Sequence, residues 1–204
     1  MKRADIAAAV RAERERLVAD LRALTAEQWE AQSLCGDWKV RDVAGHLIRV
    51  GQYYRPPYPF GWDLIRHGFR LNKALSAAAR RIGSRPISEL LDLLERSRYE
   101  QTLIFRVHYQ PLFALNEWVV HGQDIRRPLG IEASFDTDQL ITLARLSTKW
   151  YTLGTKHVTR GKRLVATDAD WSIGEGQDLR GPMEAVLMAL YGREAALRDL
   201  RPQT

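Results

Sequence analysis

ALNEWVVHGQDIRRPLG, residues 114–130, is a largely apolar helical segment that carries Glu117 and His121 four positions apart. A helix advances 3.6 residues per turn, so these two side chains share one face, with Cβ atoms about 5–6 Å apart. A third candidate, His46, lies upstream in GDWKVRDVAGHLIRV, residues 36–50. Two imidazoles and one carboxylate leave a tetrahedral metal an open position, as in catalytic sites. The pattern therefore predicts a divalent-metal site with His46, Glu117 and His121 as ligands.

The rest of the first two thirds of the chain also has helical periodicity. Thr25 and Gln28 fit a capping box for a short turn, and Asp37 is a good N-cap for the helix that carries His46. We expect helices over 4–24, 38–54 and 63–82, one after Pro86, one that contains 112–121 and ends near Gly130, and one over 138–153. Four main helices joined by short to moderate connections indicate an up-and-down four-helix bundle.

The texture of the sequence changes after the last of these helices. GKRLVATDADWSIGEGQDLRG, residues 161–181, combines β-branched and aromatic residues with Gly and Asp turns, which predicts a short hairpin. Pro182 is placed as the first residue of a helix that ends at Gly192, and a last helix is expected over 193–200. We therefore predict a helical domain over 1–154 and a small α+β domain over 155–204.

Each proposed ligand also has a simpler explanation. His46 alone could be a buried histidine with its hydrogen bonds satisfied, and Glu117 and His121 could be an ordinary pair on a helix surface. The surrounding segment argues against the surface pair, because it is strongly apolar and an unpaired buried carboxylate is costly.

Three segments resemble one protein family. LTAEQWEAQSLCGDWKVRDVAGHLIRV (24–50) resembles the amino-terminal signature of the mycothiol-dependent maleylpyruvate isomerase family, within the DinB-like superfamily of four-helix metalloenzymes. NEWVVHGQDIRRPLG (116–130) resembles its second metal motif, and RLVATDADWSIGEGQDLRGPMEAVLMALYGRE (163–194) resembles a small carboxy-terminal domain of many members. The resemblance implies His46, Glu117 and His121 as metal ligands, mycothiol or a similar thiol as cosubstrate, and isomerase or transferase activity.

The nucleophile is expected to be an external thiol, since a thiol bound to a metal such as zinc loses its proton. Cys35 is the single cysteine of the chain and is the internal alternative, although a small residue packed in a loop explains it as well. Asp124, three residues after His121, could hydrogen-bond a ligand imidazole or belong to a charge network at the helix end. Zinc is the default metal, with nickel, manganese and iron as alternatives.

The substrate contacts are less defined. Tyr53 and Trp62, at the two ends of an aromatic loop that includes RPPYPFGW (55–62), could form the wall of a substrate pocket, or the loop could cover one end of the bundle. Arg193, in LYGRE, resembles a recurring Gly-Arg of the carboxy-terminal domain and could bind a carboxylate of substrate or thiol; helix capping is the alternative.

Composition limits the remaining function classes. No apolar run approaches the roughly 20 residues of a membrane helix, and one cysteine fits a reducing compartment, so we expect a cytoplasmic protein. The net charge of +6 raises nucleic-acid binding, but arginines beside acids favour solvated helix faces instead. The expected partners are a small electrophile and a low-molecular-weight thiol, with a homodimer left open. The alternative to an enzyme is a non-enzymatic module that binds a small ligand or metal.

Overall fold

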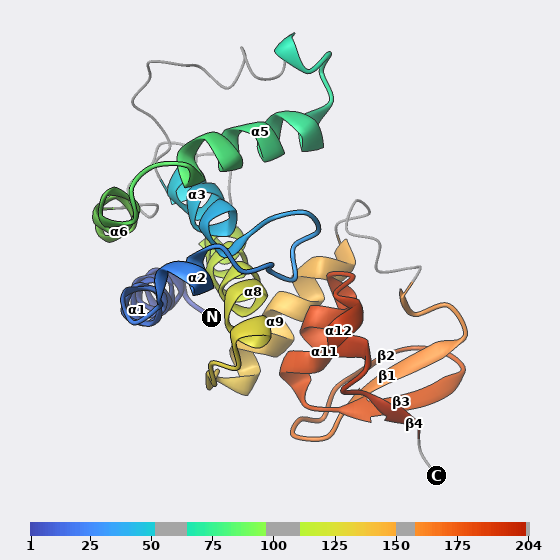
Figure 1. The fold of residues 1–204 in the computed structure, drawn as a ribbon. Helices are drawn as coiled ribbons and strands as arrows, with labels where there is room; N and C mark the ends of the chain where they lie inside the picture. Colours follow the sequence, from blue (N-terminus) through green and yellow to red (C-terminus); the bar gives the residue numbers. More distant parts are fainter. Residues whose placement is uncertain (52–64, 97–110, 150–157, 203–204) are drawn as a thin grey trace. The chain divides into compact units, whose positions relative to one another are not determined.

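The computed structural model of the chain describes residues 1–51, 65–96, 111–149 and 158–202. It divides into two compact units, Met1–Ile131 and Glu132–Thr204. The predicted fold class is confirmed, because the first unit is helical and the small sheet lies in the second (Figure 1). Within the described residues, no helix is both long enough and apolar enough to cross a membrane.

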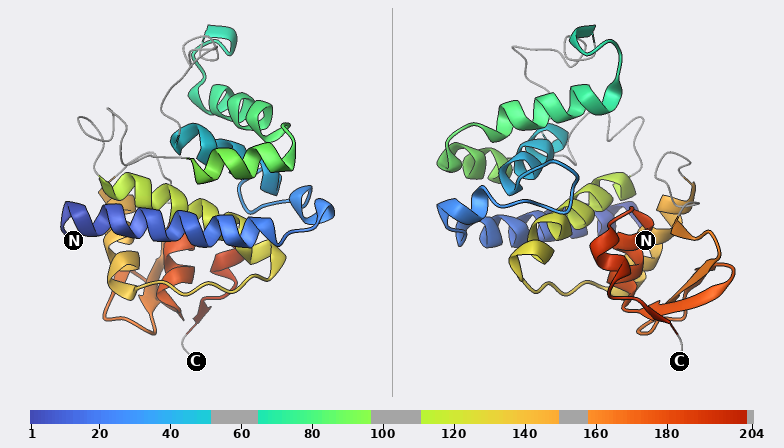
Figure 2. Two further views of the ribbon diagram at one scale, coloured as in Figure 1. Left: turned by 90° about the vertical axis from the view of Figure 1, so that its left-hand side faces the viewer. Right: turned by 45° about the vertical axis from the view of Figure 1, so that its right-hand side comes forward.

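The first unit contains a ring of packed helices. α1 packs against α8 and α6, while α3 packs against α8, α6 and α5. The left view of Figure 2 shows α1 lying along α8. The four helices α1, α8, α3 and α6 therefore surround a shared apolar core, and α5 packs on α3. The bounds are α1 (Arg3–Arg22), α2 (Ala26–Trp29), α3 (Val40–Gly51), α5 (Leu71–Gly83), α6 (Ile87–Glu95) and α8 (Pro111–Leu129).

The predicted helix boundaries around α3 need one correction. Thr25 and Gln28 form the predicted capping box of α2, but Asp37 is not the N-cap of the next helix. α3 begins at Val40, and the Asp42 carboxylate accepts a hydrogen bond from the Lys39 backbone N–H at 3.1 Å. Residues 38 and 39 are excluded from the helix because their backbone pairs with residues 32 and 33 in a tight loop.

The helix predicted over 63–82 is shorter than expected. α5 begins only at Leu71, after Phe69, whose φ of 59° is left-handed and interrupts a right-handed helix. Its end at Gly83 agrees with the prediction. The next helix, α6, starts directly after Pro86, and α8 ends before Gly130, both as predicted.

α3 and α5 approach each other at backbone distance. A Cβ added to Gly45 would lie 2.3 Å from the Ala79 backbone oxygen, and one added to Gly83 would lie 2.6 Å from the Arg41 oxygen. Glycine is therefore the residue that permits this packing. Gly45 directly precedes His46, so the same contact fixes where His46 stands.

The second unit is built on a four-stranded sheet of order β2-β1-β3-β4. β1 pairs antiparallel with β2, which confirms the predicted hairpin, and parallel with β3. Every residue of α11 except Glu184 is buried, and this helix packs against α9, α12 and β1. The bounds are α9 (Thr137–Lys149), β1 (Lys162–Ala166), β2 (Ser172–Gly174), β3 (Gln177–Gly181), α11 (Met183–Leu190), α12 (Glu194–Leu197) and β4 (Arg201–Pro202).

Three predictions for this unit differ from the structure. The domain boundary expected after residue 154 does not coincide with the division after Ile131, because α9 packs on α11 and belongs to the second unit. Pro182 is the N-cap of α11 and not its first helical residue. The helix predicted over 193–200 is limited to α12, because the chain then returns to pair β4 with β3.

Candidate metal centre

α8 carries three polar side chains on one face. Glu117, His121 and Asp124 are spaced by four and three residues, so they lie one turn apart. His121 Nδ1 lies 2.9 Å from Asp124 Oδ2, and the Asp124 side chain is completely buried. The hydrogen bond between the two is the contact predicted for Asp124. It leaves His121 Nε2 as the nitrogen on the side of Glu117.

α3 brings the third predicted ligand to the same place. His46 Nε2 lies 2.9 Å from Glu117 Oε2, and His121 Nε2 lies 3.7 Å from that oxygen. One ligand atom from each of the three residues lies within 4.8 Å of the other two. The structure therefore brings together His46, Glu117 and His121 across 71 residues of sequence.

The three donor atoms match the requirements of a small divalent ion. Two donors about 2.0–2.1 Å from zinc at a tetrahedral angle are about 3.3 Å apart. The two observed separations, 2.9 and 3.7 Å, lie on either side of that value. The set of two nitrogens and one oxygen also suits zinc, and only three of the four positions would come from these residues. His46, Glu117 and His121 are therefore suited to hold a metal with an open position.

The pKa values of the two histidines shift in opposite directions. Burial lowers the pKa of His46, and this outweighs the hydrogen bond to Glu117, which raises it. Burial also lowers the pKa of His121, but hydrogen bonds to Asp124 and Cys35 and the charges of Glu117 and Asp124 raise it further, to about 10. In the metal-free protein at neutral pH, His46 is therefore neutral and His121 carries a proton.

Two further residues reach the histidines from the loop over 31–39. The Trp38 ring centroid lies 5.1 Å from that of His46 and 6.2 Å from that of His121. Cys35 forms a second cluster with His121 and Asp124, in which one ligand atom of each also lies within 4.8 Å of the others. Sequence reasoning used Trp38 only as the start of a helix. The available signal was its place in GDWKVRDVAGHLIRV, residues 36–50, two residues before the first residue of α3.

Other predicted site residues are placed elsewhere. Tyr53 and Trp62 fall outside the described residues. Arg193 belongs to the second unit, where its guanidinium donates to the Tyr191 backbone oxygen at 2.8 Å and the residue is the N-cap of α12. Arg193 thus occupies the N-cap position of α12, but its side chain makes no cap hydrogen bond to that helix.

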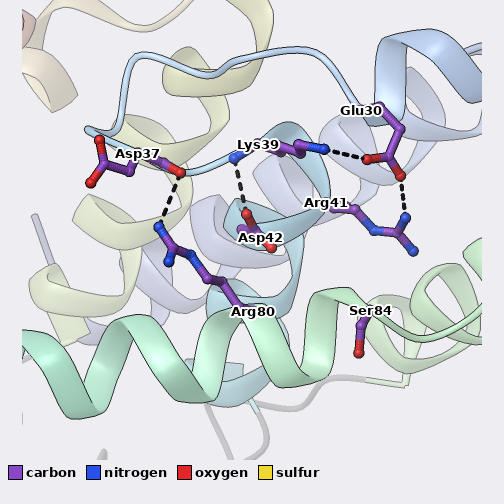
Figure 3. Close-up of a pocket in the computed structure, with 7 residues that line it drawn as sticks. All are labelled: Glu30, Asp37, Lys39, Arg41, Asp42, Arg80 and Ser84. Carbon is purple, nitrogen blue, oxygen red and sulfur yellow. Dashed lines mark hydrogen bonds and ion pairs between the residues drawn. The ribbon is translucent and has the colours of Figure 1, made fainter.

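A cavity of about 380 Å³ lies in the first unit between the loop, α3 and α5 (Figure 3). Glu30 pairs there with two cations, accepting from Lys39 at 2.8 Å and from Arg41, and Arg80 donates to the Asp37 backbone oxygen. None of the three proposed metal ligands lines it. We interpret the charged residues that line this cavity as a network that holds the loop over 31–39 in place. We interpret the cluster of His46, Glu117 and His121 as the candidate functional centre.

Comparison with known proteins gives two kinds of match. Residues 10–56, which include His46, match the family model of the mycothiol maleylpyruvate isomerase N-terminal domain. The resemblance to this family is confirmed. Crystal structures of the mycothiol-dependent maleylpyruvate isomerase and of one of its histidine-to-alanine mutants are similar in fold, with TM-scores of 0.60 and 0.65. Both cover 100% of this chain and 93% of their own, at 14% identity. No curated protein matches.

Proposed function

We propose that the protein is a divalent-metal-dependent and thiol-dependent transferase or isomerase that acts on a small electrophile. The observation that carries the proposal is the convergence of buried His46 with partly buried Glu117 and His121, from two helices, with donor atoms 2.9 and 3.7 Å apart. The family match adds the thiol, because the domain is named for mycothiol and maleylpyruvate isomerase.

The chain's own residues have distinct tasks in this proposal. The metal would be held by three atoms: His46 Nε2, Glu117 Oε2 and His121 Nε2. Asp124 keeps the proton of His121 on Nδ1, so that Nε2 is free to bind. When bound, zinc supplies a Lewis acid that converts a coordinated thiol to a thiolate at neutral pH.

We assign the nucleophile to an external low-molecular-weight thiol, such as mycothiol. Cys35 clusters with His121 and Asp124 and is not part of the His46, Glu117 and His121 group. The thiolate sulfur would form a bond to one carbon of an electrophilic double bond, whose π bond breaks as its electron pair moves to the adjoining carbonyl; protonation of that enolate gives the adduct. In a transferase the carbon–sulfur bond remains in the product, whereas in an isomerase it breaks again after rotation about the former double bond and the thiol is released.

The substrate contacts remain part of the proposal. Tyr53 and Trp62 are proposed as an aromatic wall, and Arg193 as a partner for a carboxylate of the substrate or the thiol. We further propose a cytoplasmic location, since a reduced thiol cosubstrate and the single Cys35 both fit a reducing compartment. The homodimer expected as an option stays open.

Metal content is the first test. We expect about one equivalent of a divalent metal in the purified wild type by elemental analysis, and its loss in His46→Ala and Glu117→Ala. Absence of metal from the wild type, even after reconstitution with zinc, would contradict the proposal.

Thiol consumption is the second test. The metal-loaded protein is incubated with a thiol and cis-alkene carbonyl compounds, and both the substrate and the free thiol are followed. A substrate converted without net loss of thiol identifies an isomerase, and equimolar loss identifies a transferase. Metal binding without any turnover across the panel would favour the non-enzymatic binding module instead.

A further inference from the structure

The two proposed histidine ligands are held differently. His121 donates through Nδ1 to Asp124 at 2.9 Å. His46 uses Nε2 toward Glu117, and its buried Nδ1 has no hydrogen-bond partner in the part of the chain that the structure describes. Histidines that bind metals almost always have such a partner, which fixes the rotation of the ring. Among the described residues, another contact must therefore fix the orientation of the His46 ring.

Trp38 provides that contact. Its ring lies 5.1 Å from the His46 ring, tilted by 43°, and 6.2 Å from the His121 ring, tilted by 34°. The two imidazoles themselves stand edge to face, 4.7 Å apart. Offset and tilted ring pairs at these separations are favourable arrangements. One indole therefore limits the rotation of both imidazoles.

The indole is itself fixed from two sides. Its Nε1–H donates to Ser76 Oγ on α5 at 2.6 Å. One turn further along α5, Arg80 donates to the backbone oxygen of Asp37, the residue before Trp38. The loop is also joined to α8, because the Leu34 backbone N–H donates to the Asp124 backbone oxygen at 3.0 Å.

Short hydrogen bonds within the loop fix its shape. The backbone N–H and the hydroxyl of Ser33 both donate to the Trp38 oxygen, at 3.0 and 2.7 Å. The Gln32 side-chain amide donates to the same oxygen at 2.8 Å. Three donors on one carbonyl hold the backbone from which the indole projects.

We propose that Trp38 is a positioning residue of the metal centre, which sets the ring orientation of His46 in place of the missing hydrogen bond and is anchored by Ser76. This inference rests on the proposed metal site. It extends the site beyond its ligands to α5, a helix with no proposed ligand.

Zinc affinity of Trp38 variants tests the inference. Zinc is titrated in competition with a chromogenic chelator, and the absorption spectrum of the cobalt(II) form reports the coordination geometry. For Trp38→Leu we expect a loss of zinc affinity of about 10- to 100-fold, the range found for supporting residues around metals, together with an altered cobalt spectrum. Trp38→Phe retains an aromatic face and should recover most of the affinity. Ser76→Ala should weaken binding by about threefold, as for one lost hydrogen bond.

Trp29 provides the matched control. It is as buried as a core residue, with 1% of its surface exposed, and it makes no ring contact with either histidine in the described part of the chain. Trp29→Phe should lower the thermal stability of the metal-free protein without changing the cobalt spectrum. Wild-type zinc affinity and an unchanged cobalt spectrum in Trp38→Leu would overturn the inference while leaving the proposed function intact. A wild type that binds no metal would instead overturn the proposed function. If Trp38→Leu does not fold, Trp38→Phe and Ser76→Ala decide, since wild-type affinity in both would contradict the inference.

Discussion

Two opposite faces of α8 carry buried charge, and they compensate it in different ways. Toward α1, Arg126 donates to Asp20 at 2.7 Å and to Glu13, whose side chain is 1% exposed. Toward α3, Glu117 and Asp124 contact the imidazoles of His46 and His121. A guanidinium is a permanent cation. An imidazole carries a proton that a metal can replace.

The difference shows how one helix separates structure from chemistry. Burial raises the pKa of the Glu13 carboxyl, and the charges of Arg126 and Arg16 lower it. In that cluster each carboxylate is paired with a guanidinium, Glu13 with Arg126 and Arg16, and Asp20 with Arg126. The cluster around Glu117 depends on a proton or a metal, which makes it suited to binding. The predictions below test the two clusters in order of expected effect.

Removing the permanent cation should have the largest effect. Arg126→Met leaves Glu13 buried without its main partner, so we expect the free energy of unfolding to fall by about 3–5 kcal/mol in urea denaturation. Arg22 provides the control, because its ion pair with Glu95 is largely exposed. Arg22→Met should change stability by less than about 1 kcal/mol. Equal effects of the two substitutions would remove the distinction between the clusters.

Removing the charged metal ligand should affect binding more than stability. Glu117→Gln keeps the size of the side chain but weakens an oxygen ligand, so we expect zinc affinity to fall by about 100-fold or more. The unfolding free energy of the metal-free protein should change by only about 1 kcal/mol. Glu27→Gln, at a fully exposed position of α2, is the matched control and should leave zinc affinity unchanged. Chelator competition measures the affinities, and a Glu117→Gln variant that binds zinc normally would exclude this carboxylate as a ligand.

Zinc affinity should rise with pH because His121, whose pKa is raised to about 10, carries a proton that zinc must displace. We expect about a tenfold gain per pH unit between about pH 7 and pH 9, measured by competition titration. In the metal-free protein, by contrast, the stability of the fold should fall as pH rises. The raised pKa stabilises the fold fully below the ordinary histidine value of 6.5, and this stability is lost as pH rises through about 10.

Asp124→Asn provides the comparison for this pH dependence. It removes the carboxylate that raises the His121 pKa, so zinc affinity should depend less on pH in the same range. If zinc affinity rises with pH equally steeply in the wild type and in Asp124→Asn, the displaced proton does not come from His121.

The smallest effect is expected for the internal thiol. Cys35→Ser preserves a group that can hydrogen-bond His121, so zinc affinity should stay within about threefold of the wild type. Turnover with an external thiol should persist, which mass spectrometry of the product would detect. Complete loss of turnover with normal zinc binding would transfer the role of nucleophile to Cys35.

Local sequence signals predicted most of the helices and the relation between the two proposed ligands that lie on α8. Glu117 and His121 were predictable because their relation depends only on helix geometry. The capping box at Thr25, the start of α6 after Pro86 and the hairpin of β1 and β2 are likewise local. The placement of Asp37 as an N-cap was wrong because its competitor, the pairing of residues 38 and 39 with 32 and 33, forms a loop stabilised by side-chain hydrogen bonds.

The sequence by itself determined which segments are helical, where the second unit forms strands, and, with the family resemblance, which three residues to examine as ligands. Only the tertiary structure decided what surrounds them. Trp38 meets Ser76 across 38 residues, and Arg126 meets Glu13 across 113. Such contacts depend on how close the helices come, which Gly45 and Gly83 permit for α3 and α5. Periodicity describes the face of one helix, whereas the orientation of a buried ring depends on the packing of its neighbours.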